Sequence, residues 1–330
     1  MTDNGSSAGC QLDRSGFVTR GYNAGMRGMK ASRYDGGHRV PWFVRWPHGG
    51  LDGGREVTEM CLAEDVLPTL IDLCQLEAPG NRDFDGTSLA PLLRGETERL
   101  PGDRIHHVDL RQATDPPDIW DGCVMTRDWR LVRGRELYNI HTDPGQHEDV
   151  AERHPDVVQR LRTAQEDWWR EVTPRMEQFA PISIGAPEEN PTRLDSMDVC
   201  GDVAWNQCHV AMAQKSTGLW QVNVEQTGHY RFELRRWPEE LNLPVDAGIS
   251  PDAATELAPY RREVVPQTIQ PVRARLKLAD QEVVVDVPAG STNVVIELEL
   301  PHLGQTQLEA WFQNADGGEQ GAYYVYVHRQ

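Results

Sequence analysis

Residues 2–47 read TDNGSSAGCQLDRSGFVTRGYNAGMRGMKASRYDGGHRVPWFVRWP. Asp3 and Asn4 are adjacent oxygen-bearing side chains, and Gly5 after them lets the backbone turn sharply. This pattern predicts the end of a buried strand, the place where open α/β sheets bind ligands. Asp3 and Asn4 there would offer oxygen atoms to a hard cation such as calcium or magnesium. Asp-Asn-Gly is also an ordinary turn sequence, and that interpretation stays open.

A second part of the same stretch is a glycine-rich loop around a rare lysine. Gly28-Met29-Lys30 is followed by Tyr34-Asp35-Gly36-Gly37-His38-Arg39-Val40-Pro41, whose glycines and proline indicate a shaped loop. The chain has only three lysines (Lys30, Lys215 and Lys277) among its 33 basic residues. Lysine supplies a compact charge where arginine supplies a planar fork, so Lys30 is a candidate anion-binding residue. A solvated surface lysine is the alternative.

The charge around this loop differs from that of the whole chain. Residues 11–50 carry seven basic and two acidic side chains, which gives plus five (seven minus two), while the formal net charge of the chain is −18. A local positive region in an acidic protein favours one bound anion over a polyanion spread across the surface. The basic residues are Arg14, Arg20, Arg27, Lys30, Arg33, Arg39 and Arg45.

The ordered set of Asp3-Asn4-Gly5, Gly28-x-Lys30, Gly36-Gly37-x-Arg39-Val40-Pro41 and Trp46-Pro47 resembles the later part of the catalytic domain of type I sulfatases, relatives of alkaline phosphatase. The resemblance implies that Asp3 and Asn4 are calcium ligands and that Lys30 contacts the sulfate. It also makes His38 a substrate-binding candidate. Where the family has glutamate before the two glycines, this chain has Asp35.

The nucleophile that the resemblance implies is not found in this sequence. Sulfatases use a formylglycine made from the cysteine or serine of a Cys/Ser-x-Pro-x-Arg signature, and none of the 330 residues begins such a signature. A calcium ion takes about six to eight oxygen ligands, more than Asp3 and Asn4 supply. We therefore expect a truncated reading frame or fragment that is inactive alone, with Met1 an internal methionine of a longer parent.

Composition narrows the class of protein and of partner. The chain has 38% apolar residues and a negative mean hydropathy, and its 330 residues are enough for two globular domains. Its net charge of −18 argues against nucleic acid as a partner, because phosphate backbones are bound mainly by lysine and arginine.

No signal peptide or transmembrane run is visible, so no membrane partner is expected. Localisation stays open, with export of a longer parent as one expectation. The six cysteines form no C-x-x-C pair; Cys200 and Cys208 are expected as buried thiols, or as a disulfide in an oxidising compartment.

The fold class expected for the first half is α/β, a partial sulfatase domain (residues 1–100) with a small antiparallel subdomain (residues 101–175). The apolar run Trp42–Trp46 between two prolines predicts a short buried strand. Helical spacing follows Asp65, expected as the helix cap, and recurs at Ser88–Leu93 before Gly95. The subdomain is expected to have four short strands and a closing helix: Arg104–Leu110, Cys123–Thr126, Trp129–Arg133, Glu136–Ile140, and the stretch that starts after His154-Pro155 and stops before Pro174.

Histidines in this subdomain suggest a metal site, which the spacing does not favour. His106 and His107 are adjacent, and His141, Asp143 and His147 lie close together in the sequence. Adjacent residues of a strand point to opposite faces, so His106 and His107 are not expected to share one ion.

The second half changes to the period-two pattern of antiparallel strands after a proline-rich linker. We expect the linker at residues 176–197 and an all-β sandwich accessory domain at residues 198–330. Its tryptophans could stack on sugar rings, although packing in the core is the commoner fate of tryptophans in strands. The sugar candidates are Trp205, Trp220, Trp237 and Trp311. The expected strands are Trp220–Val224, Tyr230–Arg235, Arg273–Leu278, Val283–Val287, Val294–Leu300, Thr306–Gln313 and Ala322–His328.

Three functions are compatible with these patterns. The first is a sulfuric ester hydrolase acting on a sulfated carbohydrate or aryl sulfate, with calcium and formylglycine as the implied cofactors. The second is a non-catalytic carbohydrate-binding or interaction protein. The third is a metal-dependent phosphohydrolase of the same superfamily, which would need a two-metal ligand set.

Overall fold

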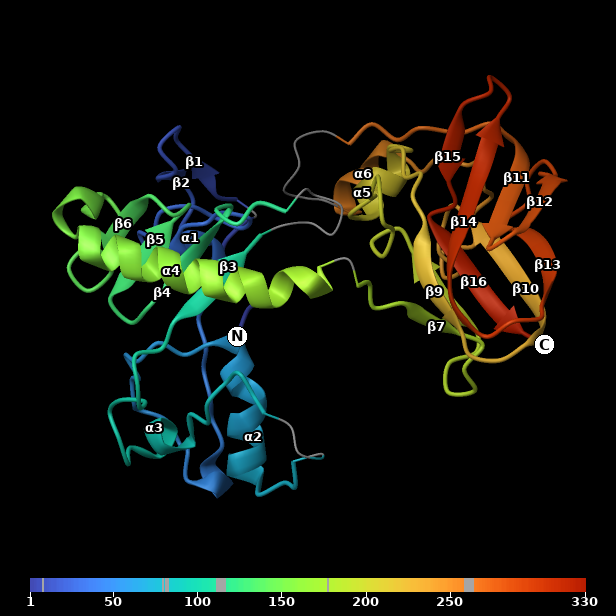
Figure 1. Ribbon diagram of the computed structural model, residues 1–330. Coiled ribbons are helices and arrows are strands. Elements are labelled where there is room, and N and C mark those ends of the chain that lie inside the picture. The colour runs from blue at the N-terminus through green and yellow to red at the C-terminus, as the bar shows by residue number, and fades with distance from the viewer. Residues whose placement is uncertain (8, 79, 81–82, 111–116, 177, 258–263) are drawn as a thin grey trace. The chain divides into compact units, whose positions relative to one another are not determined.

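The computed structural model describes residues 1–7, 9–78, 80, 83–110, 117–176, 178–257 and 264–330 (Figure 1). The chain forms two compact units, Met1–Pro174 and Arg175–Gln330. The first unit mixes helices with two antiparallel sheets, and the second is rich in strands. The mixture of α/β and β-rich parts expected from the sequence is therefore present.

The first unit contains a four-stranded antiparallel sheet in the order β3-β4-β5-β6 and a small hairpin, β1-β2. Its strands are β1 (Gln11–Leu12), β2 (Val18–Arg20), β3 (His106–Asp109), β4 (Gly122–Met125), β5 (Trp129–Val132) and β6 (Glu136–Asn139). Its α-helices are α1 (Asp35–His38), α2 (Val66–Cys74), α3 (Ala90–Arg94) and α4 (Pro155–Val172), and its short 3₁₀ helices are Pro47–Gly49, Ala63–Asp65 and Ala151–Arg153, with Thr173–Arg175 at the boundary between the units.

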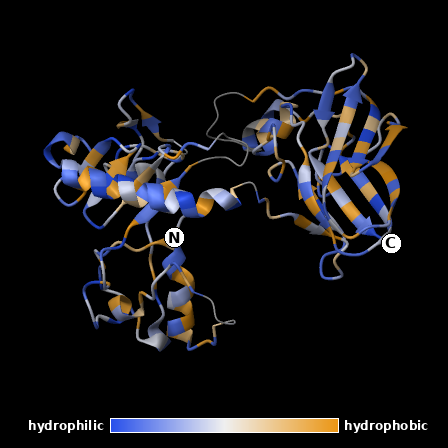
Figure 2. Cartoon of the chain, viewed as in Figure 1, coloured by the Kyte–Doolittle hydropathy of each residue, from blue (hydrophilic) through white to orange (hydrophobic). Residues whose placement is uncertain are grey.

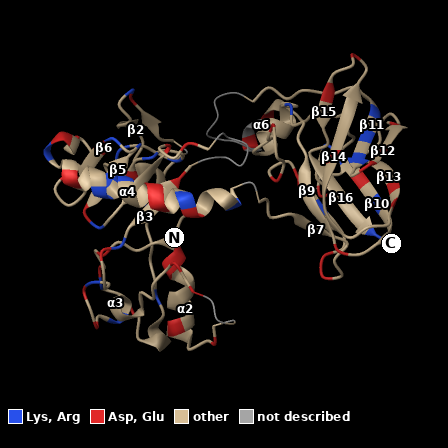
Figure 3. Cartoon of the chain, in the orientation of Figure 1, with Lys and Arg blue, Asp and Glu red and all other residues tan. Residues whose placement is uncertain are grey.

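The two faces of the four-stranded sheet have different partners. On one face, Val124, Leu131 and Leu137 pack with Leu161 of α4. Figure 1 shows α4 running across this sheet. Figure 3 shows acidic and basic positions along α4, as expected for a helix that buries only one stripe. On the other face, Tyr34 of the glycine-rich loop packs against a cluster that contains Cys123, Met125, Val132 and Tyr138. The sheet thus supports the loop that carries Lys30.

Helix α2 forms where its spacing predicts, but its cap differs from the expectation. The Asp65 side chain makes no cap hydrogen bond to α2. It instead accepts hydrogen bonds from the backbone N–H groups of Leu62 (2.8 Å) and Thr87 (2.8 Å) and pairs with Arg104 (2.6 Å). The buried carboxylate therefore joins the start of α2 to the segment before α3.

The strand predicted at Trp42–Trp46 is wrong. Phe43 is 87% exposed, and Trp46 makes only an isolated bridge with Leu51. An apolar run becomes a strand only if a neighbouring strand pairs with it, and Pro41 and Pro47 offer no N–H for such a ladder. The buried strand expected before Asp3 is also wrong, because Met1 and Thr2 are exposed and residues 3–5 form a bend.

The second unit is built from two sheets that share one core. Tyr230, Phe232 and Leu234 of one sheet lie in the same buried cluster as Leu308 and Phe312 of the other. The first sheet has the order β13-β10-β16-β8 and the second β12-β11-β14-β9-β7, with β15 also pairing with β14. Figure 2 shows the alternation of hydrophobic and hydrophilic residues along these strands. The strands are β7 (Ile182–Ile184), β8 (Thr192–Asp195), β9 (Trp220–Val224), β10 (Gly228–Arg235), β11 (Pro271–Leu278), β12 (Gln281–Asp286), β13 (Val294–Leu300), β14 (Gly304–Asn314), β15 (Glu319–Gly321) and β16 (Tyr324–Arg329), and the helices are α5 (Gln207–Ala211) and α6 (Pro251–Leu257).

The interval expected as a linker, residues 176–197, is not a linker throughout. It contains β7, which pairs in parallel with β9, and β8, which pairs with β16. Strands of three and four residues between prolines carry too little periodicity to be recognised from the sequence.

No helix in the described ranges is long and apolar enough to span a lipid bilayer. All six cysteines are free thiols, with Cys208 buried and Cys200 half-buried.

Candidate functional site

The structure brings the two halves of the N-terminal stretch side by side through backbone hydrogen bonds. The N–H of Gly5 donates to the carbonyl of Gly37 at 3.0 Å, and the N–H of Lys30 donates to the carbonyl of Ser6 at 2.9 Å. The Asp3-Asn4-Gly5 turn, the Lys30 turn and the double glycine are therefore one local structure, although they are up to 32 residues apart (37 minus 5).

Glycine is required where these segments meet, because their backbones approach too closely for a side chain. A Cβ placed on Gly5 would lie 1.8 Å from the carbonyl oxygen of Gly36. A Cβ on Gly36 would lie 2.3 Å from the carbonyl oxygen of Gly28, and one on Gly37 would lie 2.2 Å from that of Ser32. The glycines recognised in the sequence therefore fix the shape of the loop.

Asp35 anchors the loop to the sheet. Asp35 is 0% exposed, and its carboxylate accepts a hydrogen bond from Nε of Arg130 on β5 at 2.8 Å. Its backbone N–H donates to Oε1 of the buried Gln146 at 2.7 Å. Burial acts to raise the pKa of Asp35, but the adjacent His38 ring and the charge of Arg130 outweigh it and hold that pKa below its ordinary value.

Arg27 makes a second connection between the loop and the sheet. Its guanidinium lies 4.0 Å from the ring centroid of Tyr34 and donates to the hydroxyl of Tyr138 at 2.8 Å. Both tyrosine hydroxyls donate to Oε2 of Glu136, at 2.8 and 2.7 Å. Burial, followed by the hydrogen bond to Glu136, raises the pKa of both tyrosines, so both stay protonated donors at neutral pH.

The predicted site residues share this local structure to different degrees. The side chains of Asp3 and Lys30 are exposed, and Asn4 is half-buried. His38 lies with its Nε2 3.5 Å from Oδ1 of Asp35. Within the described residues no hydrogen bond or ion pair joins His38 to Asp3, Asn4 or Lys30. Asp3, Asn4 and Lys30 therefore lie on adjoining backbone segments, while His38 faces the Asp35 anchor.

The described residues do not form a calcium site by themselves. Nδ2 of Asn4 donates to Oδ2 of Asp3 at 2.5 Å, so Oδ1 of each side chain is the oxygen that this contact leaves for a cation. In the part of the chain that the structure describes, no group of three or more His, Cys, Asp or Glu residues is placed to hold a metal ion. Calcium needs about six to eight oxygen ligands, so the donor set present here is too small.

The two adjacent histidines of β3 point to opposite faces, as expected. Nδ1 of His106 lies 2.6 Å from Oε1 of Glu64, and burial lowers the pKa of His106 against the effect of that carboxylate. Nδ1 of His107 lies 2.7 Å from Oε1 of Gln165, and its ring stacks on Trp168 with centroids 4.8 Å apart. Both histidines have structural partners.

The four tryptophans considered as sugar-stacking residues fall into a buried pair and a more exposed pair. Trp220 and Trp237 are 1% and 0% exposed, and their ring N–H groups donate to backbone carbonyls. These two rings are core residues and cannot stack on a sugar. Trp205 is 45% exposed, and Trp311 is half-buried beneath the guanidinium of Arg275, 4.5 Å from its ring centroid.

Several residues that shape the site were not recognised from the sequence. Arg130 is 95 residues from Asp35, and Gln146 and Tyr138 are 111 residues from their partners Asp35 and Arg27. Each lies in or near an expected strand of the subdomain, but no local pattern distinguishes it from its neighbours.

Comparison with known proteins identifies relatives for part of the chain. No family model matches it. The chain is 44% identical over 202 residues to steryl-sulfatase of Mus musculus, covering 52% of this chain and 32% of the relative. It is 31% identical over 221 residues to steryl-sulfatase of Rattus norvegicus, covering 59% of this chain and 36% of the relative. It is 39% identical over 147 residues to arylsulfatase D of Homo sapiens, covering 42% of this chain and 24% of the relative.

The chain spans about a third of the length of the two steryl-sulfatases. A solved structure, of a ruminal GH26 endo-β-1,4-mannanase, matches 42% of this chain and 26% of its own with a TM-score of 0.24 and 11% identity, too low to indicate a shared fold. The resemblance to sulfatases expected from the sequence is confirmed by these matches: this chain is similar to the two steryl-sulfatases over about half of its length, and to arylsulfatase D over 42% of it.

Proposed function

We propose that this chain contributes the sulfate-binding part of a sulfuric ester hydrolase that acts on a sulfated carbohydrate or an aryl sulfate. The observation that carries the proposal is the joining of the Asp3–Ser6 turn, the Lys30 turn and the double glycine by backbone hydrogen bonds. The names of the relatives, steryl-sulfatase and arylsulfatase, support the same reaction class.

Lys30 is the residue to which we assign direct contact with the sulfate. Its side chain is exposed on a turn whose backbone is fixed by the Ser6 contact, so the ammonium can reach an anion from a defined position. Negative charge develops on the ester and sulfate oxygens as the bond to sulfur breaks, and a fixed cation lowers the energy of that state. A point charge suits this task where a planar fork would demand two aligned oxygens.

The residues behind Lys30 act by holding the loop. The Asp35–Arg130 pair and the Arg27–Tyr34–Glu136 contacts tie it to the four-stranded sheet at two points, on β5 and on β6. Such preorganisation matters because a catalytic cation that must first be ordered loses part of its effect. His38, which lies against Asp35, is proposed as a neighbouring substrate-binding residue.

The proposal assigns the remaining chemistry to residues outside this sequence. Asp3 and Asn4 would be two ligands of a calcium ion that needs further oxygen ligands. The formylglycine nucleophile would come from a Cys/Ser-x-Pro-x-Arg signature, which these 330 residues do not contain. We also propose the finer division into parts of a sulfatase domain (1–100 and 101–175) and an appended β-sandwich whose first strands are β7 and β8.

The test compares this chain with a version extended by any in-frame coding sequence upstream of Met1. Both are co-expressed with a formylglycine-generating enzyme and assayed for sulfate release from an aryl sulfate with calcium present. The extended version should turn over the ester and the 330-residue chain should not. An extended version that carries the nucleophile signature but hydrolyses only phosphate esters would refute the sulfatase assignment.

A further inference from the structure

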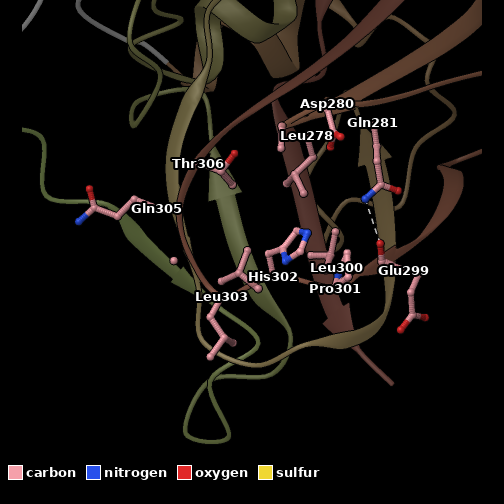
Figure 4. A pocket seen from close by; sticks show the side chains of 13 residues that line it. Leu278, Asp280, Gln281, Glu299, Leu300, Pro301, His302, Leu303, Gln305 and Thr306 are labelled. Carbon is pink, nitrogen blue, oxygen red and sulfur yellow. Dashed lines mark hydrogen bonds between the residues drawn. The ribbon is translucent and has the colours of Figure 1, made fainter.

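The second unit has a pocket of about 410 Å³ at one end of its strands (Figure 4). It lies where β9, β11 and β13 end and where β12 and β14 begin. Two connections form its walls, the β11–β12 turn at Ala279-Asp280 and the β13–β14 connection at Pro301–Leu303. The lining residues therefore come from both sheets, so the packing of the two sheets on their shared core sets the position of the pocket.

The base of the pocket is aliphatic. Val224, Leu278 and Leu300 are the last core residues of three strands, and at 4%, 2% and 2% exposed they close the pocket from below but offer a ligand almost no surface. The apolar surface open to a ligand comes from the exposed Pro301 and from Leu303, which is 64% exposed. An exposed leucine beside a hollow is a contact surface for an apolar group of a ligand.

The rim is polar and mildly acidic. Asp280, His302 and Gln305 are exposed, and Figure 4 shows the side chains of His302 and Asp280 among the lining residues. Nε2 of Gln281 donates to the carbonyl of Glu299 at 3.0 Å, which fixes one wall. The Glu299 carboxylate is paired with His229 at 2.7 Å, so Asp280 is the rim carboxylate most available to a ligand.

We infer that this pocket binds a neutral pyranose ring. The C–H face of such a ring matches the exposed Pro301 and Leu303, and its hydroxyls both donate and accept hydrogen bonds. The rim offers groups of the same mixed kind, since His302, Gln305 and the half-buried Thr306 can each donate and accept, and Asp280 accepts. The volume lies in the range of about 300–1,000 Å³ that small-molecule sites occupy. This inference does not depend on the proposed sulfate-ester chemistry.

Two other ligand classes match the pocket less well. A sulfated or phosphorylated group would meet the Asp280 carboxylate without an arginine or lysine among the lining residues. An amine would gain only a surface ion pair with the exposed Asp280, worth about 0–1 kcal/mol. The neutral ring uses both the apolar surface of Pro301 and Leu303 and the polar groups of the rim.

The experiment is calorimetric titration of the full 330-residue chain with the methyl pyranosides of glucose, galactose and mannose, beside galactose 6-sulfate and cyclohexylmethylamine. At least one neutral pyranoside should bind saturably. Asp280→Ala and His302→Ala should each weaken that binding about three- to tenfold, the loss expected for one hydrogen bond. Both side chains are exposed, so the variants should keep the wild-type unfolding midpoint.

The matched control is Asp286→Ala, which removes an exposed carboxylate at the other end of β12, outside the pocket. It should leave binding unchanged. Absence of binding by all three neutral pyranosides would overturn the inference, as would tighter binding of the sulfated sugar or the amine. Binding that neither pocket variant weakens would place the sugar elsewhere and overturn it equally.

Discussion

The buried Asp35–Arg130 pair is the contact on which the candidate site depends most. Asp35 is 0% and Arg130 7% exposed, and the pair joins the glycine-rich loop to β5. The double glycine and Lys30 could be recognised in the sequence because the loop they form depends on neighbouring residues. Arg130 could not be recognised as the partner of Asp35, because the two residues are 95 positions apart and only the folded chain brings them together.

Replacing Asp35 with asparagine should strongly destabilise the first unit, because it leaves the charge of Arg130 buried without its counter-ion. The expected loss is about 3–5 kcal/mol. Urea unfolding measures it, with Asp103→Asn as the control. Asp103 pairs with Arg160 at the surface, with side chains 60% and 44% exposed, so its removal should cost about 0–1 kcal/mol. Equal effects of the two substitutions would contradict the anchoring role.

The ionised carboxylate of Asp35, beside His38 and Arg130, predicts a pH dependence. The folded-state pKa of Asp35 is lowered from 3.8, so ionisation stabilises the fold fully above 3.8 and this contribution is lost as the pH falls through the folded pKa. The difference in unfolding midpoint between the wild type and Asp35→Asn should therefore be largest near neutral pH and should shrink below pH 3.8. A difference that stays constant down to pH 2, about two units below that value, would show that the charge of Asp35 contributes nothing.

At the level of elements, the sequence predicts best where periodicity is long and its ends are marked. Helix α4 (Pro155–Val172) begins at Pro155, the residue after which it was expected, and β13 (Val294–Leu300) has the predicted bounds. The predictions that failed concern segments that are short or that lack a pairing partner. Trp42–Trp46 is apolar but pairs with no strand in the part of the chain that the structure describes, and β7 and β8 are too short to show a period. Whether such a segment becomes a strand depends on its pairing with a distant segment, and the local sequence pattern does not predict that pairing.

The glycine-rich loop gives a prediction at this scale. Gly36→Ala should destabilise the first unit by about 1–3 kcal/mol, because the new Cβ has no room beside the backbone of Gly28. Gly248→Ala is the control, since a Cβ there meets Thr268 at 3.4 Å and Gln267 at 3.5 Å, ordinary contact distances. Its effect should stay within about 0.5 kcal/mol in the same urea titration. A harmless Gly36→Ala would mean that the loop is not as tightly packed as described.

For the whole molecule, the two units predict where the chain is cut first. Limited trypsin digestion should cleave after Arg175, at the start of the segment between α4 and β7, before it cleaves after Arg193. Both arginines are exposed, but Arg193 lies in β8 and is paired with Tyr326 of β16. Mass spectrometry of the first fragments decides the order. Early cleavage after Arg193 would contradict the assignment of β8 to the second unit.

The assignment of Lys30 to the sulfate is tested most directly by turnover in an active, extended enzyme. The three proteins to compare carry Lys30, Lys30→Ala or Lys277→Ala, assayed on one aryl sulfate at saturating calcium. Lys277 is the matched lysine, because it lies on β11 of the second unit and pairs with Glu309 at 3.5 Å. Lys30→Ala should lower kcat by about 10²–10³, the loss expected when one group that stabilises developing charge is removed. Lys277→Ala should match the parent enzyme, whereas equal turnover of the parent and Lys30→Ala would contradict the assignment of Lys30 to the sulfate.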